Sequence, residues 1–193
     1  MINRENAAAG TPPRVPAGLY TAEERVRRDE TVWTLVQGLL APFQFFVFLV
    51  SLGLVFYTLR TGELYGLTTA SVVFKTLILY VIMITGAIWE KVVFGRYLFA
   101  PAFFWEDVFS MLVLALHTAY LVALLAGALS TTALLWLALA AYGTYVINAV
   151  QFVLKLRAAR LQMQAVDQPS NQLDSGVNFR SQGEAKAQIG AAA

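Results

Sequence analysis

The sequence contains no cysteine and only one histidine, His117. Without cysteine the chain cannot form disulfides, thiolate metal sites, iron–sulfur clusters or a cysteine nucleophile. With one histidine, a single copy cannot build a zinc or di-iron centre from several imidazoles. The chain also lacks the glycine fingerprints of nucleotide-binding proteins and any flavin-type motif. We therefore expect no bound cofactor and no resident metal.

Charged residues are scarce as well. They make up 13% of the 193 residues, whereas soluble domains carry about 25%. The net charge of +2 is too small and too dispersed to indicate binding to nucleic acid. Hydrophobic side chains account for 58% of the chain, which is typical of a membrane protein. Residues 1–30 lack the apolar run and cleavage site of a signal peptide, so we expect the first spanning segment to direct insertion.

The apolar residues fall into four stretches of the roughly 20 residues that a spanning helix needs. These stretches are Thr31–Leu59, Leu67–Trp89, Trp105–Leu129 and Thr132–Leu154. The sequence therefore predicts an all-α fold, a polytopic bundle of four transmembrane helices within residues 19–161. Pro42 removes a backbone donor from the first helix and is expected to kink it. The short connections at 60–66 and 130–131 predict antiparallel hairpins.

Lysine and arginine gather at the helix ends that would share one side of the membrane. They are Arg25, Arg27, Arg28, Lys91, Arg96, Lys155, Arg157 and Arg160, whereas only Arg60 flanks the other side. The positive-inside rule then places both termini in the cytoplasm. Residues 1–18 and 162–193 are polar or rich in small residues, and this composition predicts disordered tails.

Polar side chains inside the apolar stretches mark helix faces that turn away from lipid, because an unpartnered polar group in hydrocarbon is costly. At about 100° per residue, one stripe of the third helix carries Glu106, Ser110, Val113 and His117, with Asp107 to one side. His117 lies roughly 16 Å deeper than Glu106, at 1.5 Å per residue. The polar residues expected in the cytoplasmic half are Gln37, Glu90, Glu106, Asp107, Asn148 and Gln151.

These residues also have plainer interpretations. Glu106 and Asp107 stand in the first turn of a helix, where carboxylates are favoured by the helix dipole and act as caps. The amides can simply bond neighbouring helices, and His117 is either a packing residue or a ligand of a metal or tetrapyrrole. We expect Lys75 to extend its amine toward the far membrane boundary rather than to catalyse. The aromatic residues around Pro101 form either an interfacial belt or a surface for a flat ligand; they are Tyr97, Phe99, Phe103, Phe104 and Trp105.

Within residues 20–161 the sequence closely resembles the 3-vinyl (bacterio)chlorophyllide hydratase family of phototrophic bacteria, also named 2-vinyl bacteriochlorophyllide hydratase or chlorophyllide a 3(1)-hydratase. Three segments carry the resemblance: TVWTLVQGLLAPFQFFVFLVSL (31–52), ITGAIWEKVVFGRYLFAPAFFWEDVFSMLVLALHTAYL (84–121) and YVINAVQFVLKLRAARL (145–161). It implies water addition to the C3 vinyl group of chlorophyllide a, giving a 1-hydroxyethyl group on the way to bacteriochlorophyll a. The implied location is the bacterial inner membrane, cytoplasmic or intracytoplasmic. The implied partners are chlorophyllide a, membrane lipid and other bacteriochlorophyll-synthesis enzymes.

Markovnikov hydration needs a proton donor, an oriented water molecule and an apolar slot. A desolvated carboxylic acid can keep its proton at neutral pH, so the catalytic candidates are Glu106, Asp107, Glu90 and His117. Because adjacent helical residues diverge by about 100°, Glu90 is a rival partner for either neighbouring carboxylate. His117 either ligates the substrate magnesium or relays a proton.

The substrate-binding candidates are Lys91, Arg96, Gln37, Gln44, Trp105, Tyr145 and Asn148. Lys91 and Arg96 either pair with the substrate propionate or serve membrane topology alone. The competing function is a non-enzymatic tetrapyrrole-binding or carrier protein, in which His117 ligates the metal and the carboxylates are caps. A transporter is a third interpretation, and it depends on Lys75 alone.

Overall fold

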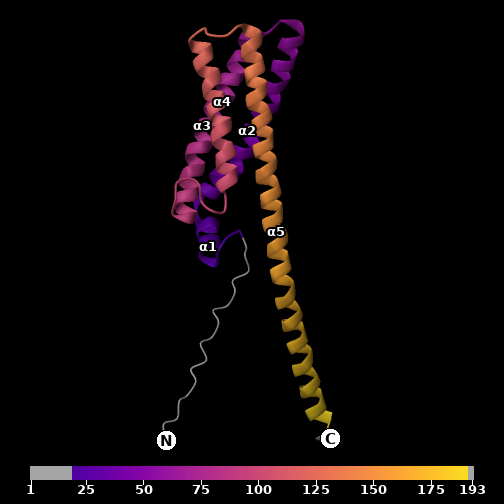
Figure 1. The fold of residues 1–193 in the computed structure, drawn as a ribbon. Coiled ribbons are helices and arrows are strands. Elements are labelled where there is room, and N and C mark those ends of the chain that lie inside the picture. The colour runs from indigo at the N-terminus through magenta and orange to yellow at the C-terminus, as the bar shows by residue number, and fades with distance from the viewer. Residues whose placement is uncertain (1–18, 191–193) are drawn as a thin grey trace, which may run out of the picture. The chain divides into compact units, whose positions relative to one another are not determined.

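The computed structural model describes residues 19–190 of the protein. Within this range the elements are α1 (Ala22–Glu30), α2 (Val32–Thr61), α3 (Tyr65–Phe94), α4 (Phe104–Leu125) and α5 (Thr131–Gly190) (Figure 1). Helices α2, α3 and α4, and the part of α5 over Thr131–Ala158, are long and apolar enough to cross a membrane. The prediction of an all-α protein with four helices able to span a membrane is confirmed.

One compact unit, Tyr20–Arg160, holds helices α1 to α4 and the apolar part of α5. The remainder of α5 belongs to a second unit and is helical as far as Gly190, where the composition predicts a disordered tail at 162–193. A helix satisfies its backbone hydrogen bonds within itself, so a polar segment can be helical without an apolar core. The tail predicted at 1–18 lies outside the described residues.

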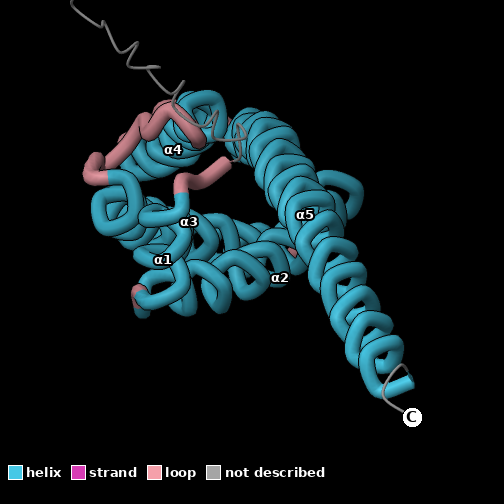
Figure 2. The backbone as a smooth tube through the Cα atoms, turned by 90° about the horizontal axis from the view of Figure 1, so that it is seen from below, coloured by secondary structure: helices cyan, strands magenta, loops and turns pink. Residues whose placement is uncertain are grey.

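Short turns join the long helices into hairpins. The α2–α3 and α4–α5 turns lie at one end of the bundle, and the α3–α4 connection lies at the other end with α1 (Figure 1). Figure 2 looks onto this second end, with the connection drawn in pink. Helix α2 ends at Gly62, which has a left-handed φ of 76° and donates its N–H to the Thr58 carbonyl. Helix α4 ends at Leu125, earlier than the predicted Leu129, because Gly127 turns the chain with a φ of 57°.

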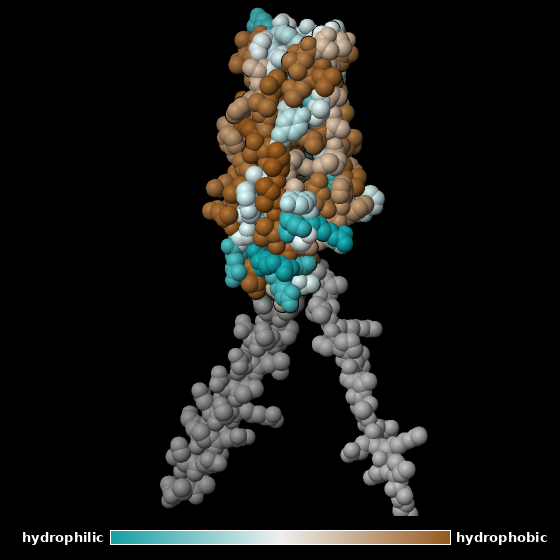
Figure 3. All heavy atoms as spheres, turned by 90° about the vertical axis from the view of Figure 1, so that its left-hand side faces the viewer, coloured by the Kyte–Doolittle hydropathy of each residue, from teal (hydrophilic) through white to brown (hydrophobic). Residues whose placement is uncertain are grey.

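The outer surface of the bundle is apolar over most of its length, and polar side chains gather at the end that carries α1 (Figure 3). Helices α2 and α3 each contain 30 residues, which corresponds to a length of roughly 45 Å. The hydrocarbon core of a bilayer is only about 30 Å thick. The ends of these helices therefore extend into the headgroup region, where water is available.

Helix α1 was not expected from the pattern of apolar residues, because the segment AEERVRRDE is almost wholly charged. A local signal was nevertheless present. Thr21 and Glu24 form a capping box, in which each side chain bonds the backbone N–H of the other. The helix is attached to α3 by a hydrogen bond of 2.9 Å from Arg27 Nε to the Val93 carbonyl.

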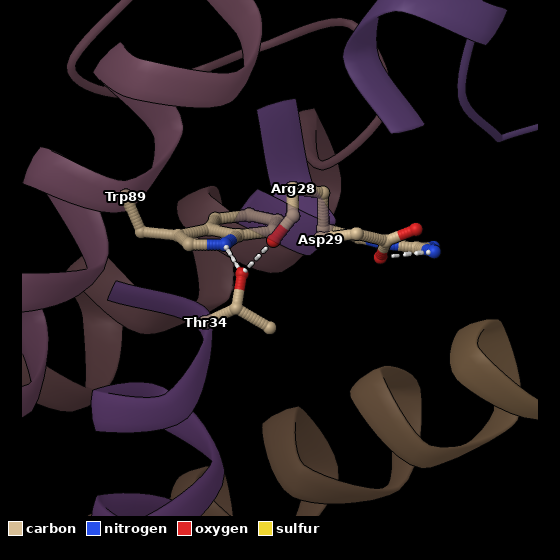
Figure 4. Close-up of polar contacts among 4 residues, drawn as sticks. All are labelled: Arg28, Asp29, Thr34 and Trp89. Carbon is tan, nitrogen blue, oxygen red and sulfur yellow. Dashed lines mark hydrogen bonds and ion pairs between the residues drawn. The ribbon is translucent and has the colours of Figure 1, made fainter. Parts of the chain in front are cut away.

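The junction of α1, α2 and α3 depends on one hydroxyl group (Figure 4). Thr34 Oγ1 donates to the Arg28 carbonyl at 2.6 Å and accepts from Trp89 Nε1 at 2.9 Å. The guanidinium of Arg28 pairs with Asp29 at 2.7 Å. Thr34 thus connects the end of α1 with the last turns of α3, directly behind the α3–α4 connection.

Thr34→Val is expected to destabilise this junction, because it leaves the Trp89 indole N–H without its acceptor. An unsatisfied buried donor costs about 1–3 kcal/mol, and each kcal/mol lowers Tm by roughly 2–4 °C in a protein of this size. The measurement is thermal unfolding of the purified protein in detergent. Thr144→Val is the control, because the Thr144 hydroxyl bonds only the Ala141 carbonyl of its own helix. Equal Tm values for the two variants would contradict the role given to Thr34.

Candidate active site

The α3–α4 connection, residues 95–103, aims two backbone N–H groups at two carboxyl groups. Phe99 N donates to Asp107 Oδ2 at 2.7 Å, and Ala100 N donates to Glu90 Oε2 at 3.3 Å. Phe99 has a φ of 59°, a left-handed conformation that costs a non-glycine residue roughly 1–3 kcal/mol. Turns of this kind collect successive N–H groups into an anion-binding concavity. The strained turn therefore positions two N–H groups to donate to the carboxyl groups.

Glu90 of α3 and Asp107 of α4 bring their carboxyl groups together. Both residues are buried, at 5% and 4% exposure, and their carboxyl groups accept from the backbone N–H groups of two successive residues, 99 and 100. Two negative charges placed together in a buried site would repel each other. The carboxyl group that lies beside Asp107 is therefore that of Glu90, which the sequence analysis named as an alternative to the adjacent Glu106.

Glu106 turns toward α5 and forms an ion pair. Its Oε2 lies 2.5 Å from Lys155 Nζ, and the Lys155 ammonium also lies 4.9 Å from the centre of the Phe103 ring. Glu106 and Asp107 diverge, as adjacent helical residues should. The site consequently contains a buried pair of carboxyl groups, Glu90 and Asp107, and a separate carboxylate beside a cation.

A polar stripe on α5 faces α4 next to these groups. Asn148 Nδ2 donates to Ser110 Oγ at 2.8 Å. Two further atoms of the stripe, Asn148 Oδ1 and Gln151 Oε1, are buried and have no hydrogen-bond partner among the described residues. Buried acceptors are normally satisfied by protein or by ordered water, so these two oxygens mark a place suited to a polar ligand.

Aromatic rings surround the connection in two groups. A buried group packs around Phe103, with Trp89 at 5.7 Å, Phe94 at 5.8 Å and Phe152 at 6.0 Å between ring centres. Tyr20 stacks on Phe94 at 5.7 Å, and burial raises the pKa of its phenol, with an opposing contribution from Arg28. These rings pack Phe103 of the connection against α3 and α5.

The second aromatic group is on the outside. Phe104 contacts Phe99 at 5.8 Å and Trp105 at 5.6 Å between ring centres. All three rings are exposed, Trp105 by 65%. They form an apolar ledge beside the residue, Phe99, whose N–H bonds Asp107.

Lys75 and His117 form a separate polar pair deeper in the bundle. Both are fully buried, and Lys75 Nζ lies 3.0 Å from His117 Nε2. The predicted extension of Lys75 to the membrane boundary is wrong, because the amine lies 4.2 Å from the centre of the Tyr145 ring and 5.1 Å from that of Tyr142. The aromatic faces and the imidazole offer the amine a closer set of partners than the headgroups do.

His117 Nδ1 lies 2.8 Å from the Val113 carbonyl. A carbonyl only accepts, so Nδ1 carries the proton and Nε2 is the acceptor that faces Lys75. Both ring nitrogens are engaged in this arrangement, and ligation of magnesium by His117 would require Lys75 to move. The predicted stripe of α4 is confirmed, since Glu106, Ser110, Val113 and His117 are all buried.

The other predicted site residues are dispersed. Gln37 Nε2 donates to Thr85 Oγ1 at 2.7 Å, Gln44 is buried on α2, and Tyr145 belongs to the Lys75 environment. Lys91 Nζ bonds the Gly95 carbonyl at 2.9 Å, and Arg96 is exposed. Sequence reasoning missed Lys155, which it used only for topology. The signal for it was its spacing, because Asn148, Gln151 and Lys155 share one face of a helix.

A profile of the 2-vinyl bacteriochlorophyllide hydratase family matches residues 20–158. The chain belongs to this family. It is 65% identical over 156 residues to the 2-vinyl bacteriochlorophyllide hydratase of Cereibacter sphaeroides, with 80% of this chain and 97% of the relative covered. It is 65% identical over 149 residues to the 2-vinyl bacteriochlorophyllide hydratase of Rhodobacter capsulatus, with 77% and 86% covered. No solved structure matches the chain.

The expected family is confirmed, and with it the hydro-lyase class that the name hydratase denotes. The residues matched to the family of 2-vinyl bacteriochlorophyllide hydratases include the whole carboxyl cluster and the Lys75–His117 pair.

His117→Leu is expected to be strongly destabilising, because it leaves the Lys75 amine without an acceptor inside the bundle. Leaving a buried hydrogen-bonding group without its partner costs about 1–3 kcal/mol, and more when the group is charged. The double variant Lys75→Met/His117→Leu removes both polar groups and should recover most of that loss. Thermal unfolding in detergent and accumulation in membranes measure both effects. A double variant as unstable as the single one would show that the pair is not a coupled unit.

Proposed function

We propose that the protein adds water across the C3 vinyl group of chlorophyllide a, giving the 1-hydroxyethyl group. The observation that carries this proposal is the buried pair of Glu90 and Asp107, which lies beside an ion-paired carboxylate, Glu106. Hydration needs one group that gives a proton and another that takes one. The family membership supports the same reaction class.

In the proposed mechanism the Glu90–Asp107 pair protonates the terminal carbon of the vinyl group. The π electrons form the new C–H bond, and the adjacent carbon becomes a cation conjugated with the macrocycle. A water oxygen then bonds that carbon, and its proton passes to the Glu106 carboxylate. Exchange with water at the headgroup region returns the proton to the pair. The reaction is redox-neutral, so its balance requires only pigment, water and protons.

The two acidic sites differ in what surrounds them, and this difference assigns their roles. Lys155 lies beside Glu106 and forms an ion pair with it. Glu90 and Asp107 lie against each other, and two charges at that distance would repel. A proton is therefore best held by the pair, while Glu106 is free to accept one.

The exposed rings of Phe99, Phe104 and Trp105 provide an apolar surface for the flat macrocycle at the edge of the membrane. A pigment on this ledge has its reacting edge near Asp107, because Phe99 contributes both a ring and the N–H that bonds Asp107. Arg96, exposed on the same connection, and Lys91, exposed in the last turn of α3, are placed to pair with the substrate propionate.

The other candidate residues take supporting roles in this proposal. Gln37 and Gln44 hold α2 against the bundle, while Tyr145 and His117 enclose Lys75. His117 does not act on the pigment metal, because Nε2 already accepts from Lys75. The same observation disfavours the alternative of a tetrapyrrole carrier, which needs an available imidazole nitrogen.

We further propose that both termini are cytoplasmic and that the protein resides in the bacterial inner or intracytoplasmic membrane. The support is the basic character of the end that carries α1 and the α3–α4 connection. The carboxyl cluster then faces the cytoplasm, where other enzymes of bacteriochlorophyll synthesis can deliver and collect pigment.

The first test supplies membranes that contain the protein with chlorophyllide a in oxygen-18 water and follows the pigment by mass spectrometry. The expected product gains one labelled water. Glu90→Gln and Asp107→Asn should each lower turnover by about 10²- to 10⁴-fold, the usual contribution of a general acid, with pigment binding retained. No mass change in the wild type, with pigment still bound, would support the carrier instead.

Glu63→Gln is the matched control for this test, because it makes the same change in an exposed carboxyl group at the opposite end of the bundle. Its only described side-chain hydrogen bond is from the Tyr57 hydroxyl, at 2.9 Å. Wild-type turnover is expected. Equal activity of Glu63→Gln, Glu90→Gln and Asp107→Asn would remove the carboxyl pair from the mechanism.

Lys155→Met is expected to reduce kcat by roughly 10- to 100-fold, corresponding to the loss of a charge-assisted hydrogen bond of about 1.5–3 kcal/mol. Lys155→Arg keeps the cation and should retain most of the activity. The KM for pigment should change little, because Lys155 contacts Glu106 and not the exposed ledge. Steady-state kinetics in detergent measure both constants. A similar loss in the Met and Arg variants would mean that Lys155 acts through packing alone.

A further inference from the structure

We infer that Asn148 and Gln151 of α5 bind the water molecule that attacks the pigment and fix the face of the vinyl group that it reaches. This inference rests on the proposed hydration. It assigns a site for the second substrate of that reaction and gives Gln151 a role that the mechanism has not used.

The register between α4 and α5 places this site. Asn148 lies opposite Ser110, at 2.8 Å, and Lys155 lies opposite Glu106, at 2.5 Å. The two helices run antiparallel, so Gln151 falls at the level of residues 107–110 of α4. It therefore lies between the amide–hydroxyl contact on one side and the ion pair on the other.

The hydrogen-bonding capacity of this region suits one water molecule. Asn148 Oδ1 and Gln151 Oε1 are both buried acceptors without partners among residues 19–190. They stand three residues apart on one helix, a spacing that puts their Cβ atoms about 5–6 Å apart. A water molecule can donate to both oxygens, and bridging water of this kind commonly satisfies buried polar groups. When it donates to both, its oxygen lone pairs point away from α5.

The neighbouring charges favour nucleophilic attack from this position. Glu106 lies one turn of α4 from Ser110 and is held by Lys155. When the water oxygen bonds the cationic carbon, one of its two hydrogens leaves its amide acceptor and passes as a proton to the Glu106 carboxylate. The proton donors, Glu90 and Asp107, lie on α3 and α4. Proton and water thus approach the vinyl group from different helices, and one face of the cation is presented to α5.

The orientation of the Asn148 amide depends on Ser110. Because Asn148 Nδ2 donates to Ser110 Oγ, the oxygen Oδ1 is turned away from Ser110 and remains free. Ser110 is therefore a positioning residue for the water site, and it does not contact the water itself.

The experiment compares the two configurations of the new hydroxyl-bearing carbon. Membranes with the wild type, Gln151→Met or Gln151→Glu are given chlorophyllide a, and the 1-hydroxyethyl products are resolved by chiral chromatography. The wild type should give an unequal ratio of configurations. Gln151→Met has similar length but no oxygen acceptor, so it should move the ratio toward equality and lower kcat by roughly 10- to 100-fold, with KM for pigment unchanged. Gln151→Glu keeps an acceptor and should preserve the wild-type ratio.

Two further variants separate water binding from general loss of packing. Asn148→Leu removes the second acceptor and should also equalise the configurations. Thr118→Val breaks another contact between helices, the 2.8 Å bond with the Tyr80 hydroxyl, and should leave the ratio unchanged. A wild-type ratio retained in both Gln151→Met and Asn148→Leu would overturn the water site, as would an equal ratio in the wild type. Failure of the wild type to hydrate the pigment would instead overturn the proposed function.

Discussion

A polar group inside a membrane has no bulk water to bond, so it needs a partner within the protein. This requirement explains most of the contacts that join the helices here. Glu106 meets Lys155, Lys75 meets His117, and Asn148 meets Ser110, each across a helix boundary. The carboxyl groups of Asp107 and Glu90 satisfy the same requirement by accepting from the backbone N–H groups of residues 99 and 100. In the proposed mechanism this buried pair also acts as the acid.

The α3–α4 connection supplies the backbone donors that the carboxyl groups of the candidate site need. Without its left-handed turn at Phe99, the N–H groups of residues 99 and 100 would not both reach the carboxyl groups. The cost of that turn is offset by the two hydrogen bonds and by the packing of Phe103 among its aromatic neighbours. The connection therefore orders the site, supplies its backbone donors and exposes the aromatic ledge, all within nine residues.

The sequence was sufficient for the membrane helices because hydrophobic length is a strong and local signal. It was also sufficient for the inward stripe of α4, since helical periodicity places Glu106 and His117 on one side. The sequence did not show whether Glu106 or Glu90 lies beside Asp107, because that depends on how α3 and α4 are rotated about their axes. Lys155 was missed as a site residue and Lys75 was misplaced for a related reason. A lysine near an apolar segment can reach the headgroups or a buried partner, and only the packed bundle shows which is closer.

The Lys75–His117 pair and the carboxyl cluster differ in their access to water, and this difference bears on function. The Lys75–His117 pair is fully buried, and the Lys75 amine lies against the rings of Tyr142 and Tyr145. It is therefore best understood as a connection between α3 and α4. The carboxyl cluster lies at the end of the bundle, where the helices outrun the hydrocarbon core and Lys155 keeps 24% of its side chain exposed. Water can arrive there from outside while the pigment stays in lipid. The proposed reaction joins a membrane-bound pigment with water and therefore suits such a boundary, and the carboxyl groups proposed to supply its proton lie at the same level.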